Sequence, residues 1–421
     1  MSISKRQIAL VIAGNAFEWL DFVVYASLSS VLTKLFFPNT DFNSGLLMTL
    51  AIFSMSFLAR PIGGLIFGHL GDAYGRRVAL YTSGGILAFT SIAIALMPTY
   101  ETLGIVAPII LLLVRVIQSI AIGGEYPALV TYLIESSPTG KRGLYGTFAQ
   151  ISTTGGVLLA TLVMMGLNSW LTEEQIIGWG WRLPFGIGFI TLLICLYYRF
   201  KLLETPEFQA ARKKLTHFTK APVKEALTQH YRSIIFIFIM IMAPAVVFYT
   251  YNISGQMLVK RLPVSDQVKL WLPVFNAILL TGLMPVCGLL IDRLGWQKVM
   301  GTGFILAIIA GTPIYYIMQQ PGLFALLSAQ LLWAIIAALI LSCVPISLVD
   351  STEVSTRTTV LAISYNLCLV LFGGFTPTIN LMLSNYNPVL PGVYISVVSV
   401  ISLLCIVKFS PQAYTQQLQR A

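Results

Sequence analysis

GNAFEWLDF, residues 14–22, lies in the middle of an apolar segment that runs from about Ile8 to Val31. A helix of about 20 apolar residues crosses a bilayer, so this segment is long enough to span a membrane. Glu18 and Asp21 are three residues apart and therefore share one face of that helix. A carboxylate at the centre of a bilayer costs about 3 kcal/mol by insertion scales, and such residues usually mark an ion or substrate path. The stretch therefore predicts a buried polar site.

The composition of the whole chain is that of a membrane protein. Of its 421 residues, 57% are hydrophobic and 10% are charged, with a mean hydropathy of +0.82. Soluble domains have about 25% charged residues. The net charge of +10 does not indicate nucleic acid as a partner, because the basic residues lie between apolar segments. Their distribution follows the orientation rule of membrane proteins instead.

Apolar segments separated by polar breaks predict an all-α integral membrane protein with twelve membrane-spanning helices. The longest polar stretch lies between the sixth and the seventh segment. We therefore expect an N-terminal six-helix bundle (1–200), a cytoplasmic central loop (201–232) and a C-terminal six-helix bundle (233–421). The expected spans are 8–33, 44–70, 78–97, 104–134, 143–168, 180–200, 233–259, 268–291, 298–317, 322–348, 358–383 and 390–408.

Lysines and arginines predict how the chain is oriented. Most of them lie on the side of the expected helices that holds the N-terminus, and the opposite side has only Lys34, Lys260, Arg261 and Lys269. Cytoplasmic loops of membrane proteins carry an excess of basic residues. Both termini and the central loop are therefore expected in the cytoplasm. The first apolar segment is too long for a signal peptide and carries two acids, so we interpret it as an uncleaved span.

The two halves carry a faint internal repeat. GHLGDAYGRR (68–77) follows the second expected span, and GLLIDRLGWQK (288–298) follows the eighth. Repeats of this kind are typical of transporters that bind a substrate between two halves near the middle of the membrane.

Residues 68–77 resemble the signature loop of the major facilitator superfamily, with Ala73 where that family often has a basic residue. The resemblance implies that Asp72, Arg76 and Arg77 hold a gate closed rather than bind substrate, and the repeat extends this role to Asp292. The alternative is a solvated turn that only anchors the topology.

Further stretches are similar to the metabolite:proton symporter family within that superfamily. They are ARPIGG (59–64), GGEY (123–126), SPTGKRG (137–143), GWRLPF (180–185) and ETPEF (204–208), together with residues 14–22. The resemblance covers nearly all of the N-terminal half and, more loosely, 365–377. Known members import small carboxylates and zwitterions such as oxoglutarate, citrate, shikimate, proline and betaines.

The resemblance implies a monomeric secondary transporter in the bacterial inner membrane, which imports a small organic acid, amino acid or betaine with protons by alternating access. Its partners would be the small-molecule substrate and the lipid bilayer. An exporter of a metabolite or drug that exchanges it for protons has the same fold and remains an alternative. An enzyme is not expected, because no catalytic pair lies near a membrane face.

Three buried carboxylates are candidates for proton coupling. Glu18 lies about 15 Å from the cytoplasmic end of its helix at 1.5 Å per residue, where burial and a nearby guanidinium act on its pKa in opposite directions. Asp21 is either a second proton carrier or a permanent ion-pair partner of Arg115 or Arg60. Glu125 is either a third carrier or part of the inner gate.

Arginines and polar residues within the spans are candidates for substrate binding. Arg115, with Gln118 on the same helix face, could bind a substrate carboxylate through two hydrogen bonds or hold Glu18 ionised. Arg60 either faces the substrate or pairs with an acid. Amide and aromatic groups of the C-terminal half suit a small zwitterion; those we expect at the site are Tyr249, Asn252, Trp333 and Asn366.

The sequence predicts no cofactor, with the proton as the coupling ion. The five cysteines lie singly in apolar segments, and the three histidines form no metal-binding motif. No nucleotide-binding loop is present either.

Overall fold

The computed structural model describes residues 5–214, 221–254, 264–320 and 322–409. Within these ranges, twelve helices are long and apolar enough to cross a membrane, which confirms the number predicted from the sequence. Lys260 and Arg261, which were used to predict the orientation, lie outside the described residues.

The N-terminal half contains six long helices. They are α1 (Lys5–Ser27), α3 (Phe42–Ala73), α4 (Arg76–Ala95), α6 (Val106–Glu135), α7 (Arg142–Trp170) and α9 (Leu183–Arg199). Short elements join them: α2 (Ser29–Phe36), α5 (Tyr100–Leu103), α8 (Glu173–Gly178) and the 3-10 turn η1 (Gly180–Arg182). The first expected span is therefore divided near Leu28 into α1 and α2.

The C-terminal half follows two short helices, α10 (Pro206–Lys214) and α11 (Pro222–Gln229). Its long helices are α12 (Tyr231–Tyr249), α14 (Asp266–Leu294), α15 (Trp296–Met318), α16 (Leu323–Leu341), α18 (Arg357–Cys368) and α20 (Leu390–Phe409). They are completed by α17 (Val344–Asp350), α19 (Thr376–Tyr386) and the π-helical turns η2 (Thr250–Ser254) and η3 (Leu369–Gly373).

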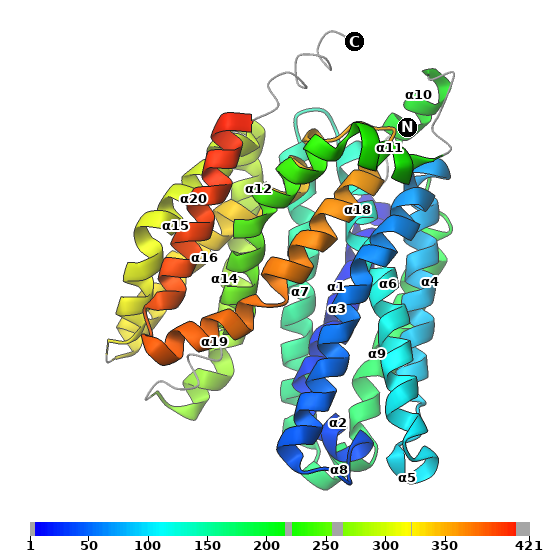
Figure 1. The fold of residues 1–421 in the computed structure, drawn as a ribbon, viewed down its shortest axis with the longest axis vertical. Helices are drawn as coiled ribbons and strands as arrows, with labels where there is room; N and C mark the ends of the chain where they lie inside the picture. Colours follow the sequence, from blue (N-terminus) through cyan, green and yellow to red (C-terminus); the bar gives the residue numbers. More distant parts are fainter. Residues whose placement is uncertain (1–4, 215–220, 255–263, 321, 410–421) are drawn as a thin grey trace.

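The two ends of the molecule differ in how the halves meet. Helices α10 and α11 lie at one end, together with the start of α1, and α2 and α8 lie at the other (Figure 1). At the α10–α11 end, α18 packs against α3 and α14 packs against α7. Toward the α2–α8 end, α19 lies well away from α2 and α8 (Figure 1). The halves are therefore in contact mainly at the α10–α11 end.

Glycines allow the two halves to approach closely there. A Cβ atom at Gly68 of α3 would lie 2.8 Å from the Cα atom of Thr359, and one at Gly288 of α14 would lie 2.9 Å from the Cα atom of Leu144. Real Cβ atoms essentially never come this close to backbone atoms. These two contacts, one from each half of the internal repeat, bring the helices backbone to backbone.

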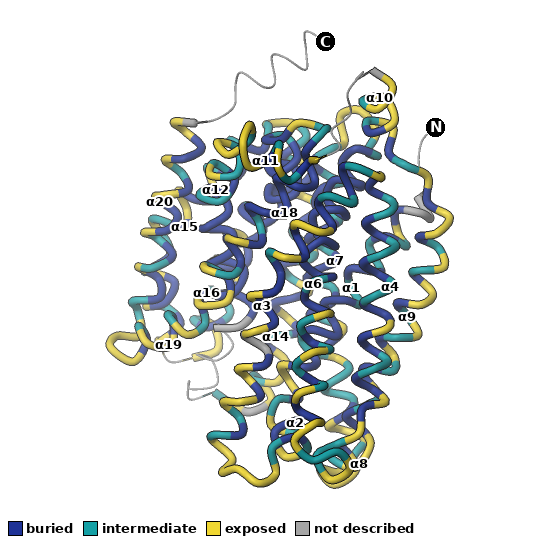
Figure 2. The backbone as a smooth tube through the Cα atoms, turned by 45° about the vertical axis from the view of Figure 1, so that its right-hand side comes forward, coloured by how far each residue is buried: buried dark blue, intermediate teal, exposed yellow. Residues whose placement is uncertain are grey.

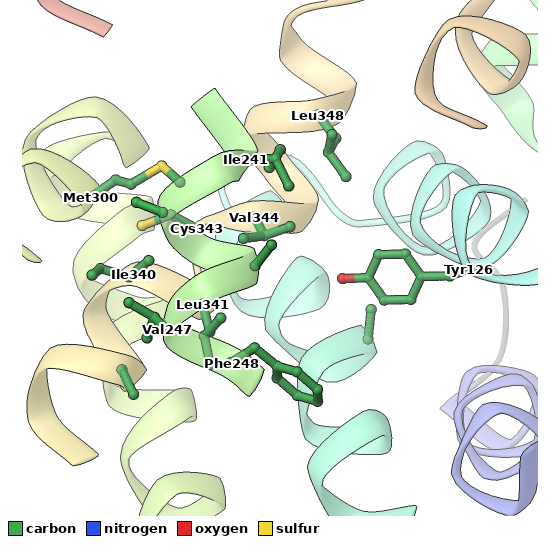
Figure 3. Packing of buried hydrophobic residues seen from close by; sticks show 14 of the residues in the cluster. Tyr126, Ile241, Val247, Phe248, Met300, Ile340, Leu341, Cys343, Val344 and Leu348 are labelled. Atoms are coloured by element: carbon green, nitrogen blue, oxygen red, sulfur yellow. The ribbon is translucent and has the colours of Figure 1, made fainter. Parts of the chain in front are cut away.

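The interior of both halves is largely apolar, and so are many outward-facing positions. Buried residues follow the inner faces of the helices, whereas exposed ones lie on the outer faces and at the ends (Figure 2). The buried cluster between the halves includes Phe248 from α12 and Val344 from α17, and the ring of Tyr126 points toward them from α6 (Figure 3). Exposed apolar side chains such as Phe89 and Ile309 suit contact with lipid.

Two spans of the C-terminal half contain a π-helical turn, one at the end of the span and the other near its middle. Helix α12 continues into η2, and α18 continues into η3. Tyr249, the last residue of α12, packs against η3, because a Cβ atom at Gly373 would lie 2.7 Å from its Cε2 atom. π-helical turns are rare and occur frequently at functional sites. These two turns therefore mark Tyr249 and its neighbours as candidate site residues.

Candidate functional site

The first polar cluster lies inside the N-terminal half and is centred on Asp21. Ser91 Oγ donates to Asp21 Oδ1 at 2.8 Å, and Gln118 Nε2 donates to Oδ2 at 2.7 Å. Arg115 Nη1 lies 3.4 Å from the same Oδ2 atom, and its guanidinium stacks on the Tyr25 ring with Cζ 3.6 Å from the centroid. Of the alternatives left open for Asp21, the structure therefore contains the ion pair with Arg115.

A second ion pair lies closer to the α10–α11 end. Arg199 Nη2 donates to Glu125 Oε1, Ser83 Oγ donates to Oε2, and Arg199 Nη1 donates to the Leu80 carbonyl at 2.9 Å. The sequence analysis did not identify Arg199 as a site residue. Its side chain points into the bundle and is 1% exposed.

Glu18 and Arg60 are different, because neither has a full set of partners. Both are buried, and neither Glu18 Oε2 nor Arg60 Nε has a hydrogen-bond partner. Among the described residues, Arg60 forms no salt bridge; its Cζ atom lies 4.1 Å from the Phe57 ring centroid and 5.0 Å from that of Phe22. Arg60 also interacts electrostatically with Glu18. This guanidinium and this carboxylate are therefore available to a ligand or a proton.

Aromatic rings from both halves meet next to Arg60. The centroids of Trp19 and Phe248 are 5.4 Å apart, and those of Phe57 and Tyr249 are 6.4 Å apart. The hydroxyl group of Tyr249 interacts with Arg60. Arg60 therefore lies where rings of the two halves come together.

A small cavity of about 20 Å³ lies in this region, which is room for about one water molecule. Its lining includes Trp19 and Gln150 from the N-terminal half and Phe248, Tyr249 and Tyr365 from the C-terminal half. Arg60 and Glu18 are not among the lining residues, and the cavity adjoins Arg60 through Tyr249.

Tyr126 and Tyr365 form another aromatic contact between the halves at this level. Their ring centroids are 4.8 Å apart with an angle of 17° between the planes. The Tyr126 hydroxyl group donates to Gln150 Oε1 at 2.7 Å. This stacked pair links α6 and α18 beside the cavity.

The other residues expected from the C-terminal half lie elsewhere. Asn252 donates to the Phe248 carbonyl at 3.0 Å and is not among the residues that line the cavity. Trp333 packs near Tyr251, with ring centroids 6.5 Å apart. Asn366 donates to the Gly123 carbonyl of the other half at 2.6 Å. Of this predicted group, Tyr249 alone lines the cavity.

Residues predicted to form the gate lie at the α10–α11 end, where two helix N-termini are capped across the halves. Asp72 accepts hydrogen bonds from the backbone N–H groups of Thr358 (3.0 Å) and Thr359 (2.8 Å) in the first turn of α18. Asp292 accepts them from Gly143 (2.6 Å) and Leu144 (3.1 Å) in the first turn of α7. A carboxylate is stabilising at a helix N-terminus, so the internal repeat builds the same contact twice.

A buried ion-pair network surrounds Asp72. Arg76 Nη1 donates to Asp72 Oδ1 at 3.0 Å, while Nη2 lies 3.2 Å from Glu135 Oε1. Arg357 of the C-terminal half donates to that same Glu135 oxygen at 2.7 Å and to Glu207 Oε2 at 2.8 Å. Both arginine side chains are buried. The sequence analysis expected Arg76 at the gate but did not identify Arg357.

Arg77 takes no part in this network. Its side chain donates to the Phe200 carbonyl at 2.7 Å, and its backbone N–H donates to Glu204, which also accepts from the backbone N–H of Arg76. Glu204 thus caps α4, and burial raises the pKa of its carboxyl group from the ordinary value of 4.5. Arg77 therefore contacts the N-terminal half and the segment that follows it.

The described residues contain no group of three or more His, Cys, Asp or Glu side chains that could hold a metal ion. Unpaired charges and aromatic rings are instead buried between two halves of a membrane-spanning helical protein. The fold and this site define a membrane transporter.

Comparison with known proteins defines the family. The model of the family described as "Sugar (and other) transporter" matches residues 7–229. A proline/betaine transporter of Salmonella typhimurium is 33% identical over 413 residues, which cover 95% of this chain and 82% of the relative. A glycine betaine/proline/ectoine/pipecolic acid transporter of Dickeya dadantii is 32% identical with the same coverage. This chain belongs to the sugar (and other) transporter family of the major facilitator superfamily.

The solved structures agree on the fold. The superfamily's proton:xylose symporter XylE, bound to 6-bromo-6-deoxy-D-glucose, superposes with a TM-score of 0.78. The alignment covers 96% of this chain and 95% of that one, at 17% sequence identity. The twelve-helix fold in two six-helix bundles is therefore that of the superfamily.

Proposed function

We propose that this protein imports a small zwitterion of the proline or betaine type together with a proton, by alternating access. The observation that carries the proposal is Arg60, a buried guanidinium that forms no salt bridge with a described residue and lies beside aromatic rings of both halves. A guanidinium binds a carboxylate through two parallel hydrogen bonds, and aromatic faces attract quaternary ammonium groups. The names of the relatives support the same class of substrate.

In this proposal the two ends of the zwitterion bind different groups. Its carboxylate pairs with Arg60, while its ammonium group lies against the rings of Trp19, Phe248 and Tyr249. These rings come from both halves, so the bound substrate would hold the halves together. The cavity is smaller than such a substrate, and the site must open before the substrate enters.

Glu18 is the residue that we propose couples transport to the proton. It is buried, interacts with Arg60, and has an oxygen without a partner. In a medium of low dielectric constant, the positive charge of one guanidinium balances the negative charge of one carboxylate. When the substrate carboxylate pairs with Arg60, Glu18 loses its compensating charge and takes up a proton. Asp21 differs, because Arg115, Gln118 and Ser91 already satisfy it.

We further propose that the chain acts as a monomer in a bacterial inner membrane, with both termini and the loop 201–232 in the cytoplasm. The α10–α11 end is then the cytoplasmic end, and the halves meet there. Both halves of the candidate site come from one chain, which supports the monomer. A cysteine at Ala221, an exposed position immediately before α11, should react with a charged thiol reagent only from the cytoplasmic side.

The test of the proposed function uses the purified protein in liposomes with labelled proline or glycine betaine. Wild-type protein should accumulate the substrate when the outside is acidic, and proton uptake should accompany it. Glu18→Gln should lose accumulation but keep the exchange of labelled for unlabelled substrate. Asp41→Asn is a matched control, because Asp41 is an exposed cap of α3. Proton-dependent accumulation by Glu18→Gln would show that Glu18 is not the carrier.

Arg60 is tested by binding. Arg60→Met should weaken the binding of zwitterionic substrates about 10- to 150-fold, because a hydrogen bond to a charged group contributes about 1.5–3 kcal/mol. Melting temperatures of the purified protein with and without proline, betaines and other small carboxylates measure the loss, since a ligand of the native state raises stability by mass action. If none of these compounds raises the melting temperature of the wild-type protein, the substrate class is wrong.

A further inference from the structure

Arg199 occupies a slot that four helices of the N-terminal half build around its guanidinium group. The side chain comes from the last turn of α9 and contacts Glu125 of α6 and the Leu80 carbonyl of α4. A Cβ atom at Gly84 of α4 would lie 2.6 Å from Arg199 Nη1, and one at Gly14 of α1 would collide with Nη2. Only glycine leaves room for the guanidinium at these two positions.

Glu18 lies next to this slot. It follows Gly14 by four residues, one turn along the same face of α1, and side chains on a helix lean toward its N-terminus. The Glu18 carboxylate therefore extends toward the turn at which Gly14 touches Arg199, and the two side chains interact electrostatically. Glu18 Oε2 and Arg199 Nε are both buried and both without a hydrogen-bond partner. One guanidinium thus adjoins a paired carboxylate and an unpaired one.

The charges that face Glu125 are few. Glu18 approaches from α1 and Arg199 from α9, where Cys195 also lies nearby, while α4 contributes the Ser83 hydroxyl group. Burying an ionised carboxylate without a compensating charge costs free energy, and such a group usually becomes neutral by binding a proton. Since Arg199 pairs with one carboxylate at a time, the carboxylate that it leaves favours the protonated form.

We propose that Glu125 and Arg199 form a second proton-binding station, which receives the proton from Glu18 on its way to the cytoplasm. This rests on the proposed proton-coupled uptake. The proton leaves the Glu18 carboxyl group and binds the Glu125 carboxylate, while the Arg199 guanidinium moves from Glu125 to the newly ionised Glu18. The charge of the three groups is the same before and after. Arg199 is a positioning residue in this step, because it carries no proton itself.

The position of Glu125 agrees with this direction. It lies ten residues before Glu135, the last residue of α6, and thus about 15 Å from the α10–α11 end at 1.5 Å per residue. Arg199 ends α9 at that same end. Arg199, the partner of Glu125, touches Gly14, which precedes Glu18 by one turn of α1 and therefore lies closer to the α10–α11 end, the side that we assign to the cytoplasm.

Two neighbouring glycines provide a test that changes no charge. Gly84→Ala places a methyl group against Arg199 Nη1 and must displace the guanidinium, whereas a Cβ atom at Gly85 would meet only Leu196 Cδ2, at 3.8 Å. Proton uptake, net accumulation and substrate exchange are measured in liposomes as a function of pH. Gly84→Ala should shift the pH at which proton uptake is half-maximal, and Gly85→Ala should behave as the wild type.

Glu125→Gln tests the station directly. It should lose proton uptake and net accumulation to a much greater extent than substrate exchange. Wild-type proton uptake in Glu125→Gln, or equal pH profiles for Gly84→Ala and Gly85→Ala, would overturn the station while leaving the proposed function intact. Substrate transport by the wild-type protein without any proton uptake would overturn both. If Glu125→Gln does not fold, the pair of glycine variants decides.

Discussion

Asp72 is the position at which a single charge should control which end of the transporter is closed. Its side chain is fully buried and accepts two backbone N–H hydrogen bonds from the first turn of α18 in the other half. Opening the α10–α11 end separates α3 from α18 and breaks both bonds. Asp72→Asn keeps the shape of the side chain but removes its charge. The pair with Arg76 lies within the N-terminal half and is weakened in both states, so the difference between the states comes from the two bonds to α18.

The magnitude follows from the two bonds. An asparagine still offers one amide oxygen as an acceptor, so the variant loses about one hydrogen bond to a charged group, worth about 1.5–3 kcal/mol. Because about 1.4 kcal/mol corresponds to a factor of ten in an equilibrium constant, we expect the ratio of closed to open molecules to fall about 10- to 150-fold. The interaction of a carboxylate with the N-terminus of α18 acts in the same direction.

Distances between spin labels measure this ratio. Lys201 and Lys298 are both exposed. Lys201 follows α9, the last long helix of the N-terminal half, and Lys298 lies in the first turn of α15 in the C-terminal half. Cysteines at these two positions, in a variant without the five native cysteines, report the separation of the halves. Asp72→Asn should populate the longer distance. Asp41→Asn is the control, since Asp41 caps only its own helix. Equal distance distributions for the two variants would refute the reasoning.

Three further predictions follow from the same contacts and from the packing. Asp292→Asn should populate the longer distance as well, because Asp292 makes the equivalent pair of bonds to α7, and the double variant Asp72→Asn/Asp292→Asn should exceed either single one. Burial raises the pKa of Glu204 above 4.5, so its contribution to the free energy of unfolding is complete below pH 4.5 and is lost as the pH rises through the raised pKa. Glu204→Gln should therefore flatten the decline of the melting temperature over that range, and an unchanged slope would contradict the assignment. Gly63→Ala should destabilise the protein by about 1–3 kcal/mol, because its Cβ atom would collide with the Ile120 carbonyl oxygen. Gly166→Ala is the control, because its Cβ atom would lie in open space. Equal melting temperatures for the two variants would contradict the close contact of α3 and α6.

Charge in an apolar context marks part of the site in the amino-acid sequence. Glu18, Asp21, Arg60 and Arg115 stand out because a charge in the middle of a span is costly and needs a reason. Arg199 gave no such signal, since an arginine at the end of a span is equally compatible with a loop exposed to water. Hydropathy along the chain does not say which way a terminal side chain points.

Helix packing decided which groups the repeated acids contact. The repeat predicts that Asp72 and Asp292 have related roles, and the gate was inferred from resemblance. That Asp72 caps α18 and Asp292 caps α7 depends on how α3 meets α18 and how α14 meets α7. Those helices are far apart in the chain, and their glycines allow a backbone contact that no local pattern reveals.

The sequence by itself determined the twelve spans, the class of protein and the presence of charges within the membrane, because these depend on local hydropathy and on the cost of burying charge. Only the tertiary structure decided the pairing: Asp21 with Arg115, Glu125 with Arg199, and Glu18 and Arg60 left without full partners. Ion pairs act over a few ångströms between helices that are distant in the chain. Their partners are therefore selected by packing geometry, which the composition of each helix does not specify.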